Sequence, residues 1–473
     1  MAPHATNGPG DGSQKDEGLH LVIIGAGLAG LAAALSTKLA NPDHRVTICE
    51  AVKNLQEIGA GLQITPNGTR LLSQWGLVPA LAPLAAVPKS LSVHRYDGTK
   101  LLAHEPDLQA QVHTRYGHPF WDLHRVDLQR ALINKCVKLG VEIKLNSRTV
   151  SVDFDSATVH LHDGRKIQGD LVLLTDGLWS TIRPQFLGRP SPAKLTGDLA
   201  YRITIHIDDI PADHPDREEL VSFIQNPTVN FWVGPYTHVV GYSVSADPDT
   251  DGKPAVYNIV MLCPDDLPDE VVKAETTPAQ IAEVFASWDP FLRKFISTLS
   301  TPNFSNESSA VGGLRAIHKW KLMWLNSEDC PTWASPSGKF FIAGDACHPM
   351  LPYLAQGANS SLEDGAVFGH LLGKVSRFKA ETQLPKLAAM YQTLRMERGR
   401  KIQLETFKQR DDFHLPDGPE QEARDKRMMD MLQNGNQLEA PFPSRWTCPE
   451  VQQFLYGYDA YAAAEEAWKA DPF

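Results

Sequence analysis

The chain has 473 residues, of which 42% are hydrophobic and 21% are charged, and its formal net charge is −11. This length and apolar content suffice for a large core and more than one domain. The acidic balance excludes the basic surface that binding to nucleic acid or to an anionic membrane requires, so we expect neither partner.

Residues 1–18 are rich in Gly, Pro, Asp and Ser, and predict a disordered tail rather than a signal peptide. The most apolar stretch, Leu21–Leu35, is too short and too interrupted by glycine to span a bilayer, which takes roughly 20 apolar residues. Six cysteines are scattered without a C-x-x-C pair. We therefore expect reduced thiols, no metal site and a cytoplasmic enzyme.

The first predicted elements form a strand–helix–strand unit. Leu19–Ile24 is typical of a short buried strand, Leu28–Ala40 of a helix rich in Ala and Leu, and Arg45–Cys49 of a second strand. Such a unit indicates the start of a parallel sheet.

Three glycines with G-x-G-x-x-G spacing, Gly25, Gly27 and Gly30, join the first strand to the helix. They allow a tight turn, close approach of the backbone to a pyrophosphate, and close packing of helix on strand. Glu50 ends the second strand, where a carboxylate can bind a ribose diol and repel a 2′-phosphate. The pattern predicts a dinucleotide site that disfavours NADP, although a tight turn in another α/β protein is the alternative.

Farther along, Leu123–Cys136 predicts a helix, while Val150–Leu161 and Lys166–Leu174 predict strands around a turn. Lys339–Ala343 predicts another buried strand, and the chain is mostly helical from Ser361 onward. Between these elements, the residues from 199 to 261 alternate apolar and polar. This alternation indicates antiparallel strands of a second, inserted domain.

Two further stretches follow at characteristic positions. The first runs from Asp170 to Arg183 and contains Asp176-Gly177, and the second begins Gly344-Asp345-Ala346-Cys347-His348-Pro349. Together with the glycine-rich turn, they resemble the motifs of the class A flavoprotein hydroxylases, the para-hydroxybenzoate hydroxylase superfamily. The stretch from 344 to 365 is most similar to the salicylate hydroxylase branch, and the C-terminal segment is similar to fungal members. The resemblance covers roughly residues 19–400 and implies an FAD cofactor.

The resemblance also assigns residues to the flavin. Asp176 and Arg183 are expected to face phosphate and ribose groups, and Asp345 to accept hydrogen bonds from the ribityl hydroxyls. Thr175 departs from the small Ala usual in the family. We expect His348 to be a hydrogen-bonding loop residue and Cys347 a packing residue rather than catalytic groups.

A helix is expected to begin at Ser361, because Ser361-x-x-Asp364 matches a capping box, and to point its N–H groups at the flavin ring. Arg125, at another helix start, suits a pyrophosphate, although a surface cation is the alternative. The remaining expected cofactor residues are Ala60, Gly61, Gln63, Gly357, Ala358 and Asn359.

The expected fold is therefore α/β, with a Rossmann-like FAD-binding domain built on a parallel sheet, an inserted antiparallel-sheet substrate domain and a helical C-terminus. The predicted boundaries are 19–90, 118–196 and 312–400 for the FAD-binding domain, 91–117 and 197–311 for the substrate domain, and 401–473 for the extension.

The family resemblance also implies the reaction. No second G-x-G-x-x-G is present, and relatives bind NAD(P)H only transiently. The reduced flavin reacts with O₂ to give a C4a-hydroperoxide, which hydroxylates an aromatic, phenolic substrate. A buried phenolate needs a nearby cation or donor, because burial alone raises the pKa of a phenol.

Arg202 is the candidate cation, and strand alternation places it on one face with Thr204 and His206. Tyr242, on another predicted strand, is the candidate partner hydroxyl, as in related fungal hydroxylases that dearomatise phenols. A salt bridge for Arg202 and a core position for Tyr242 are the alternatives.

Two other functions remain open at this point. Relatives also epoxidise alkenes in terpenoids or alkaloids of secondary metabolism, and a flavin-binding protein without catalysis would act through interactions. The sequence does not distinguish NADH from NADPH or a monomer from a homodimer.

Overall fold

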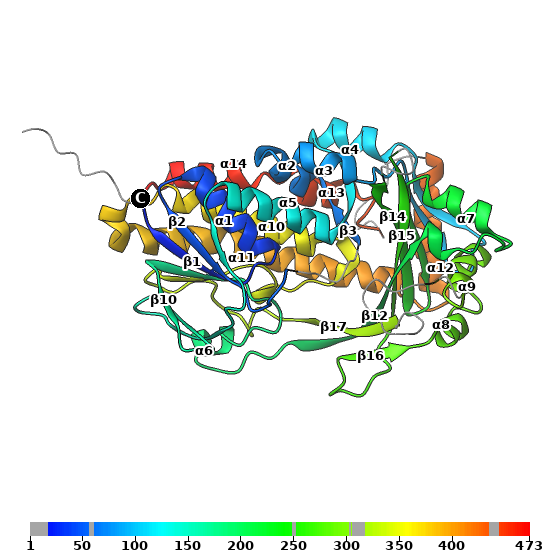
Figure 1. Cartoon of the computed structure of the whole chain (residues 1–473). Helices are drawn as coiled ribbons and strands as arrows, with labels where there is room; N and C mark the ends of the chain where they lie inside the picture. Colours follow the sequence, from blue (N-terminus) through cyan, green and yellow to red (C-terminus); the bar gives the residue numbers. More distant parts are fainter. Residues whose placement is uncertain (1–17, 56–60, 248–251, 302–303, 305–316, 435–443) are drawn as a thin grey trace, which may run out of the picture.

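The computed structural model describes residues 18–55, 61–247, 252–301, 304, 317–434 and 444–473 (Figure 1). The predicted tail and Ala60 therefore lie outside the described residues, apart from Gly18. Among the residues described, no helix is long and apolar enough to cross a membrane.

The N-terminal unit belongs to a five-stranded sheet in which all neighbouring strands are parallel, in the order β18-β11-β1-β2-β7. Apart from the edge strand at residues 142–144, which is partly exposed, its strands are fully or largely buried, as expected for a parallel sheet covered by helices. The strands are β1 (His20–Ile24), β2 (Arg45–Cys49), β7 (Glu142–Lys144), β11 (Leu171–Leu174) and β18 (Phe340–Ile342).

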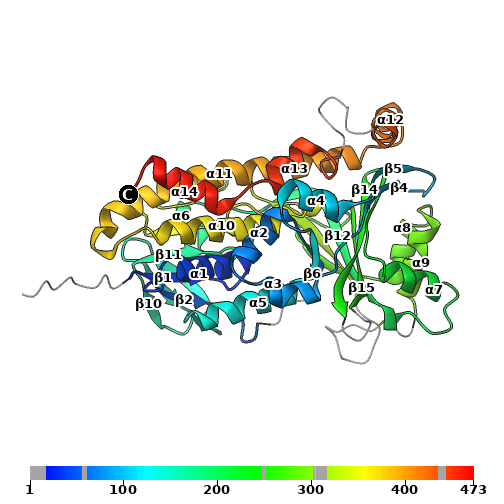
Figure 2. The ribbon, with the colours of Figure 1, turned by 90° about the horizontal axis from the view of Figure 1, so that it is seen from above.

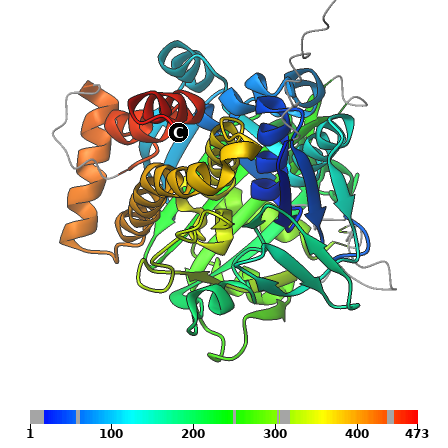
Figure 3. The same cartoon turned by 90° about the vertical axis from the view of Figure 1, so that its left-hand side faces the viewer.

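Helices α1 (Leu28–Ala40) and α10 (Gln356–Leu372) pack against each other beside this sheet (Figure 3). The contact is close because glycines of α10 face α1. A Cβ on Gly365 would lie 2.5 Å from the backbone nitrogen of Ala33, and a Cβ on Gly369 would lie 2.5 Å from that of Thr37.

An eight-stranded, mostly antiparallel sheet forms the other half of the molecule (Figure 1). One of its faces packs on helices α7 (Arg217–Ile224), α8 (Pro278–Val284) and α9 (Pro290–Thr298), which lie on the side away from the parallel sheet (Figure 2). In sheet order, its strands are β16 (Lys273–Thr276), β17 (Ile317–Trp324), β12 (Lys194–His206), β15 (Lys253–Pro264), β14 (Thr237–Asp247), β13 (Val229–Gly234), β4 (Leu91–Arg95) and β5 (Leu101–Glu105).

The structure places β17 in this eight-stranded sheet, where it pairs with β12 and β16, although the sequence analysis grouped residues from 312 onward with the FAD-binding domain. Short strands complete the fold: β3 (Gly61–Ile64) pairs with β6 (Trp121–His124), and a small antiparallel sheet contains β8 (Thr149–Asp153), β9 (Thr158–Leu161) and β10 (Lys166–Gln168).

The long helix α11 (Ala380–Phe413) connects the two halves (Figure 2). Tyr391 donates its hydroxyl to the carbonyl of Ile342 in β18, and Arg410 donates to the carbonyl of Thr196 in β12. The remaining helices are α2 (Pro66–Gln74), α3 (Val78–Leu81), α4 (Leu108–Tyr116), α5 (Arg125–Lys138), α6 (Arg183–Leu187), α12 (Pro419–Asn434), α13 (Pro449–Tyr456) and α14 (Ala460–Ala470).

Most predicted elements are present, but three were drawn too long. The stretch 166–174 contains two strands of different sheets, β10 and β11, rather than one strand. The stretch 150–161 is a hairpin rather than one strand, because the Asp153 carboxylate accepts the N–H groups of Asp155 and Ser156 and turns the chain. The predicted helix 123–136 starts at Arg125, because Leu123 and His124 belong to β6.

Candidate active site

A first cavity of about 360 Å³ lies at the carboxyl ends of β1, β2 and β11. Gly25, Gly27, Glu50 and Asp176 line it. The Glu50 carboxylate accepts the N–H of Ala26 at 2.8 Å and therefore also fixes the glycine-rich turn. Gly30 lies outside the cavity wall, where a Cβ would come within 2.2 Å of the Gly25 carbonyl oxygen, so its role is close packing.

Thr175 and Asp176 end β11 beside that turn. The Thr175 hydroxyl lies 2.9 Å from the carbonyl oxygens of both Ile24 and Gly25, so this departure from the family pattern joins two motifs. One oxygen of Asp176, Oδ1, is buried without a hydrogen-bond partner, and burial raises the pKa of this carboxyl group to about 6. Such an orphaned acceptor fits a ligand hydroxyl.

Arg183 does not face a phosphate, contrary to the expectation from the sequence. Its buried guanidinium donates to the carbonyls of Leu178, Ser191 and Ala346. These bonds hold the 176–183 loop against the loop after β18 and leave no donor directed at the cavity.

A second cavity of about 270 Å³ adjoins the first and shares Gly27, Thr175 and Gly177 with it. It lies between the loops at the end of the parallel sheet and the eight-stranded sheet, because residues that follow β11 and β18 and residues of β12, β14 and β15 line its wall. The structure brings the following predicted residues to this wall: Gly27, Gly61, Gln63, Arg125, Arg202, Tyr242, Asp345, Gly357 and Ala358.

Helix α10 begins at Gln356, five residues before the predicted start. Ala355, the residue before the helix, adopts a left-handed conformation with φ of 51°. The helix therefore starts directly after it, and Ser361 lies inside the helix. The capping-box prediction is therefore wrong. The N–H groups of the first turn belong to Gln356, Gly357 and Ala358, and the latter two residues line the second cavity.

Asn359 is buried and does not line either cavity. Its side chain accepts the N–H of Thr65 at 3.2 Å and donates to the carbonyls of Gln63 and Ala355. It thus fixes the start of α10 against β3 rather than presenting a group to the cavity.

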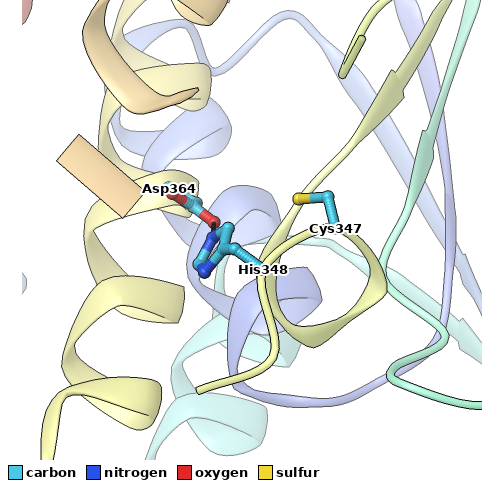
Figure 4. Close-up of side chains that lie close together, drawn as sticks. All are labelled: Cys347, His348 and Asp364. Atoms are coloured by element: carbon cyan, nitrogen blue, oxygen red, sulfur yellow. Dashed lines mark hydrogen bonds and ion pairs between the residues drawn. The ribbon is translucent and has the colours of Figure 1, made fainter. Parts of the chain in front are cut away.

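Asp364 anchors the loop after β18 instead of capping the helix. It accepts a hydrogen bond from His348 Nε2 at 2.5 Å (Figure 4). It also accepts the N–H of Gly344 at 2.8 Å and Arg395 Nε at 2.7 Å. Cys347 lies beside it, and burial raises the pKa of that thiol well above its usual value. These carboxylate oxygens are already engaged and the thiol stays protonated, so the cluster is an ion-pair network that positions Asp345.

Asp345 projects into the second cavity from the turn Gly344–Ala346. Its position inside the protein raises the pKa of the carboxyl group, while the charges of His348 and Arg125 act in the opposite direction. Gln63 lies across the same cavity and donates its Nε2 to Asp122 Oδ1 at 3.1 Å.

Arg202 and Tyr242 meet at the wall formed by the eight-stranded sheet. Their strands are not adjacent, because β15 lies between β12 and β14. Arg202 pairs with Val260, which pairs with Val240, and Tyr242 lies two residues farther along β14 on the same face. Desolvation inside the protein lowers the pKa of Arg202, although part of its side chain is exposed, and burial raises the pKa of Tyr242, while the Coulomb interaction between them opposes both shifts.

Several lining residues were not predicted from the sequence, among them His238, Asn258, Tyr353 and Trp446. His238 lies four residues before Tyr242, so strand alternation alone could have placed it on the same face. Asn258 accepts the N–H of Gly61 at 3.1 Å, and its own Nδ2 is buried without a partner among the described residues. Trp446 comes from the C-terminal segment, and no pattern in the sequence indicated that it would line the cavity.

The two adjoining cavities fit FAD. A Cβ on Gly27 or Gly357 would meet no atom within 4 Å, so the backbone is open to a ligand at both positions. Gly27 begins α1 and Gly357 lies in the first turn of α10, where N–H groups favour phosphates and the anionic ring of a reduced flavin. The orphaned Asp176 oxygen supplies an acceptor in the first cavity.

Comparisons with known proteins agree with this geometry. The family described as "FAD binding domain" matches residues 19–262 and 308–404. FAD-dependent monooxygenase OpS4 of Beauveria bassiana (strain ARSEF 2860) is 43% identical over 456 residues, which are 95% of this chain and 97% of that protein. A 3-amino-4-hydroxybenzoate 2-monooxygenase of Streptomyces platensis, PtnB3, is 30% identical over 86% of this chain and 92% of its own length.

Solved structures share the fold. CtdE in complex with FAD and a substrate has a TM-score of 0.74 at 20% identity, over 96% of this chain and 98% of that chain. A salicylate hydroxylase substrate complex has a TM-score of 0.71 at 19% identity, with the same coverage. The chain belongs to the FAD-dependent monooxygenase family that carries this FAD binding domain, the class A aromatic hydroxylases.

Proposed function

We propose that this protein hydroxylates a phenolic substrate, with FAD as cofactor and NAD(P)H and O₂ as co-substrates. The observation that carries the proposal is the placement of Arg202 and Tyr242 in the cavity that Gly61, Gly357 and Asp345 also line. A cation and a hydroxyl group thus share one wall with the residues proposed to hold the flavin.

The bound flavin would take electrons from NAD(P)H and supply activated oxygen to the substrate. The chain's own residues would bind and orient the aromatic ring. Arg202 would stabilise the phenolate, and electron release from that oxygen makes the ring carbon more nucleophilic. Because burial raises the pKa of Tyr242, its hydroxyl would stay protonated and donate a hydrogen bond.

Aromatic and apolar side chains would exclude water from the remainder of the cavity. Trp446 Nε1 donates to the carbonyl of Tyr353 at 2.9 Å, so the C-terminal segment is fixed against the turn Pro352–Leu354 at the cavity wall. Exclusion of water protects activated oxygen from unproductive breakdown.

A phenol fits this cavity better than an alkene. An alkene offers no acceptor to the guanidinium of Arg202, which is exposed and lines the cavity, whereas a phenolate would accept charge-assisted hydrogen bonds from it. The names of two relatives, a 3-amino-4-hydroxybenzoate 2-monooxygenase and a 3-hydroxybenzoate 6-hydroxylase, also indicate ring hydroxylation of anionic phenols.

The experiment is a screen of purified holoenzyme with NADH or NADPH against hydroxybenzoates, other phenols and unsaturated terpenoids. We expect a phenol to accelerate NAD(P)H oxidation and to yield a matching amount of hydroxylated product. Acceleration by terpenoids alone would support epoxidation, and acceleration by no compound would favour a non-catalytic flavin protein.

A further inference from the structure

Two histidines connect the second cavity to the outer part of the protein. His238 Nδ1 lies 2.7 Å from His414 Nε2. His238 belongs to β14, whereas His414 immediately follows α11, so the pair joins segments 176 residues apart in the sequence. A contact between two imidazoles at this distance is a hydrogen bond in which one ring donates and the other accepts.

His238 is placed to contact a molecule in the cavity. It lines the wall with Arg202 and Tyr242, and only 1% of its surface is exposed. Its pairing partner on β15 is Leu262, two residues from Val260, the partner of Arg202, so both side chains leave the same face of the sheet. Nδ1 is bonded to His414, which leaves Nε2 for a molecule in the cavity.

His414 leads away from the cavity. It is half-buried, and its carbonyl accepts the N–H of Tyr236, a residue whose side chain is exposed. The pair packs among Tyr353 and Phe413. The charge of Arg410, on α11, acts on His414. Arg410 in turn lies 3.7 Å from Asp198, on β12, which also accepts the Tyr353 hydroxyl.

Neither imidazole is suited to keep a proton. Burial lowers the pKa of His238 well below its ordinary value, and burial together with the charge of Arg410 lowers the pKa of His414 to about 3. Both rings are therefore neutral near pH 7, so the pair can pass a proton along without storing a charge.

We propose that His238 and His414 form a path that carries the proton of the bound phenol from the cavity to solvent. The phenol O–H bond breaks as a bond forms between its proton and His238 Nε2. As this bond forms, His238 gives its Nδ1 proton to His414 Nε2 and His414 releases its Nδ1 proton to water, so neither ring carries a charge. The substrate is left as a phenolate beside Arg202, and both rings end neutral with their tautomers exchanged.

This inference rests on the proposed function, and the test separates the two. Oxidised holoenzyme is mixed anaerobically with the phenol that most accelerates NAD(P)H oxidation, and a pH-indicator dye and the phenolate absorbance are followed by stopped flow. The variants are His238→Gln, which removes the proton acceptor, and His414→Gln, which keeps a hydrogen-bond acceptor for the Nδ1–H of His238 but cannot relay a proton. His162→Gln changes an exposed histidine outside the cavity lining and is the matched control.

We expect wild type and His162→Gln to release one proton with the same rate constant as phenolate formation. In His238→Gln and His414→Gln, the rate constants of proton release and of phenolate formation should fall about a hundredfold, the contribution typical of a positioned proton acceptor. His414→Ala should be slow as well, and added imidazole should restore its rate, which a merely structural role would not allow.

Unchanged proton release in His414→Gln, or no rescue of His414→Ala by imidazole, would overturn the proton path while leaving the hydroxylase proposal intact. If no phenol accelerates NAD(P)H oxidation by the wild-type enzyme, the proposed function fails and the proton path fails with it. Retained FAD absorbance in each variant shows that the fold is preserved.

Discussion

Arg202 and Tyr242 leave the same face of the eight-stranded sheet, separated by strand β15 and offset by two residues along it. This relationship puts a guanidinium and a phenolic hydroxyl at one cavity wall. The two side chains have different roles at this wall. Arg202 supplies the positive charge, whereas Tyr242, held neutral by burial, supplies a hydrogen bond.

Arg202→Ala should reduce substrate-stimulated hydroxylation by between about tenfold and a hundredfold, the range expected for one lost charge-assisted hydrogen bond. FAD content should not change, because Arg202 belongs to the sheet opposite the glycine-rich turn. Product formation and the flavin absorbance measure the two effects. Arg202→Lys keeps the charge and should retain part of the activity, and undiminished turnover by Arg202→Ala would remove the residue from the mechanism.

Asp345→Ala should lose flavin during purification. The carboxylate lines the second cavity and is expected to accept hydrogen bonds from the ribityl chain, so its removal should weaken FAD binding by about tenfold or more. Asp345→Asn keeps one acceptor and should lose less. The ratio of flavin to protein absorbance reports the result, and a stoichiometric ratio in Asp345→Ala would contradict the assignment.

Two glycines of one turn should respond differently to alanine. Gly27 has a φ of −72°, and its Cβ would meet no protein atom within 4 Å, so Gly27→Ala should fold normally and weaken FAD binding about tenfold or more. Gly30→Ala would place a Cβ 2.2 Å from the Gly25 carbonyl and should destabilise the apoprotein itself. Thermal unfolding of both apoproteins and FAD titration of Gly27→Ala test this contrast, which fails if Gly27→Ala binds FAD as wild type does.

The Asp364 ion pairs should contribute to stability in a pH-dependent way. Burial opposes ionisation of this carboxyl group, but His348 and Arg395 outweigh it and lower its pKa to about 2. A lowered pKa stabilises the fold above the unfolded value, near 3.8, and this contribution is lost as the pH falls from about 4 to about 2.

Asp364→Asn should therefore cost about 3 kcal/mol of unfolding free energy at pH 7. It should also lose less stability than wild type between pH 4 and pH 2. Denaturant unfolding at several pH values gives both results, and parallel curves for the two proteins would contradict the role of Asp364.

The sequence predicted the parts of the fold that depend on local patterns. Helix α1 and strand β2 have the expected bounds, because glycine spacing and alternation define them without help from distant residues. The sequence could not show that Ala355 would adopt a left-handed conformation and start α10 early, nor that β15 would separate Arg202 from Tyr242. The strand order depends on contacts between segments far apart in the chain.

The candidate site was predicted unevenly for the same reason. Motif residues such as Asp345 and Gly357 line the cavity, whereas Arg183 is fully engaged by carbonyl groups that no local pattern reveals. His238 was within reach of the alternation that identified Tyr242. Trp446 was not, since only the folded chain brings the C-terminal segment to the cavity.

The most direct test of the central claim is hydroxylation under ¹⁸O₂. Purified holoenzyme with NAD(P)H and the phenol that most accelerates its oxidation should form a product that carries one ¹⁸O atom, in a yield matching the reductant consumed. A product without the label, or NAD(P)H oxidation that no phenol accelerates, would contradict the account.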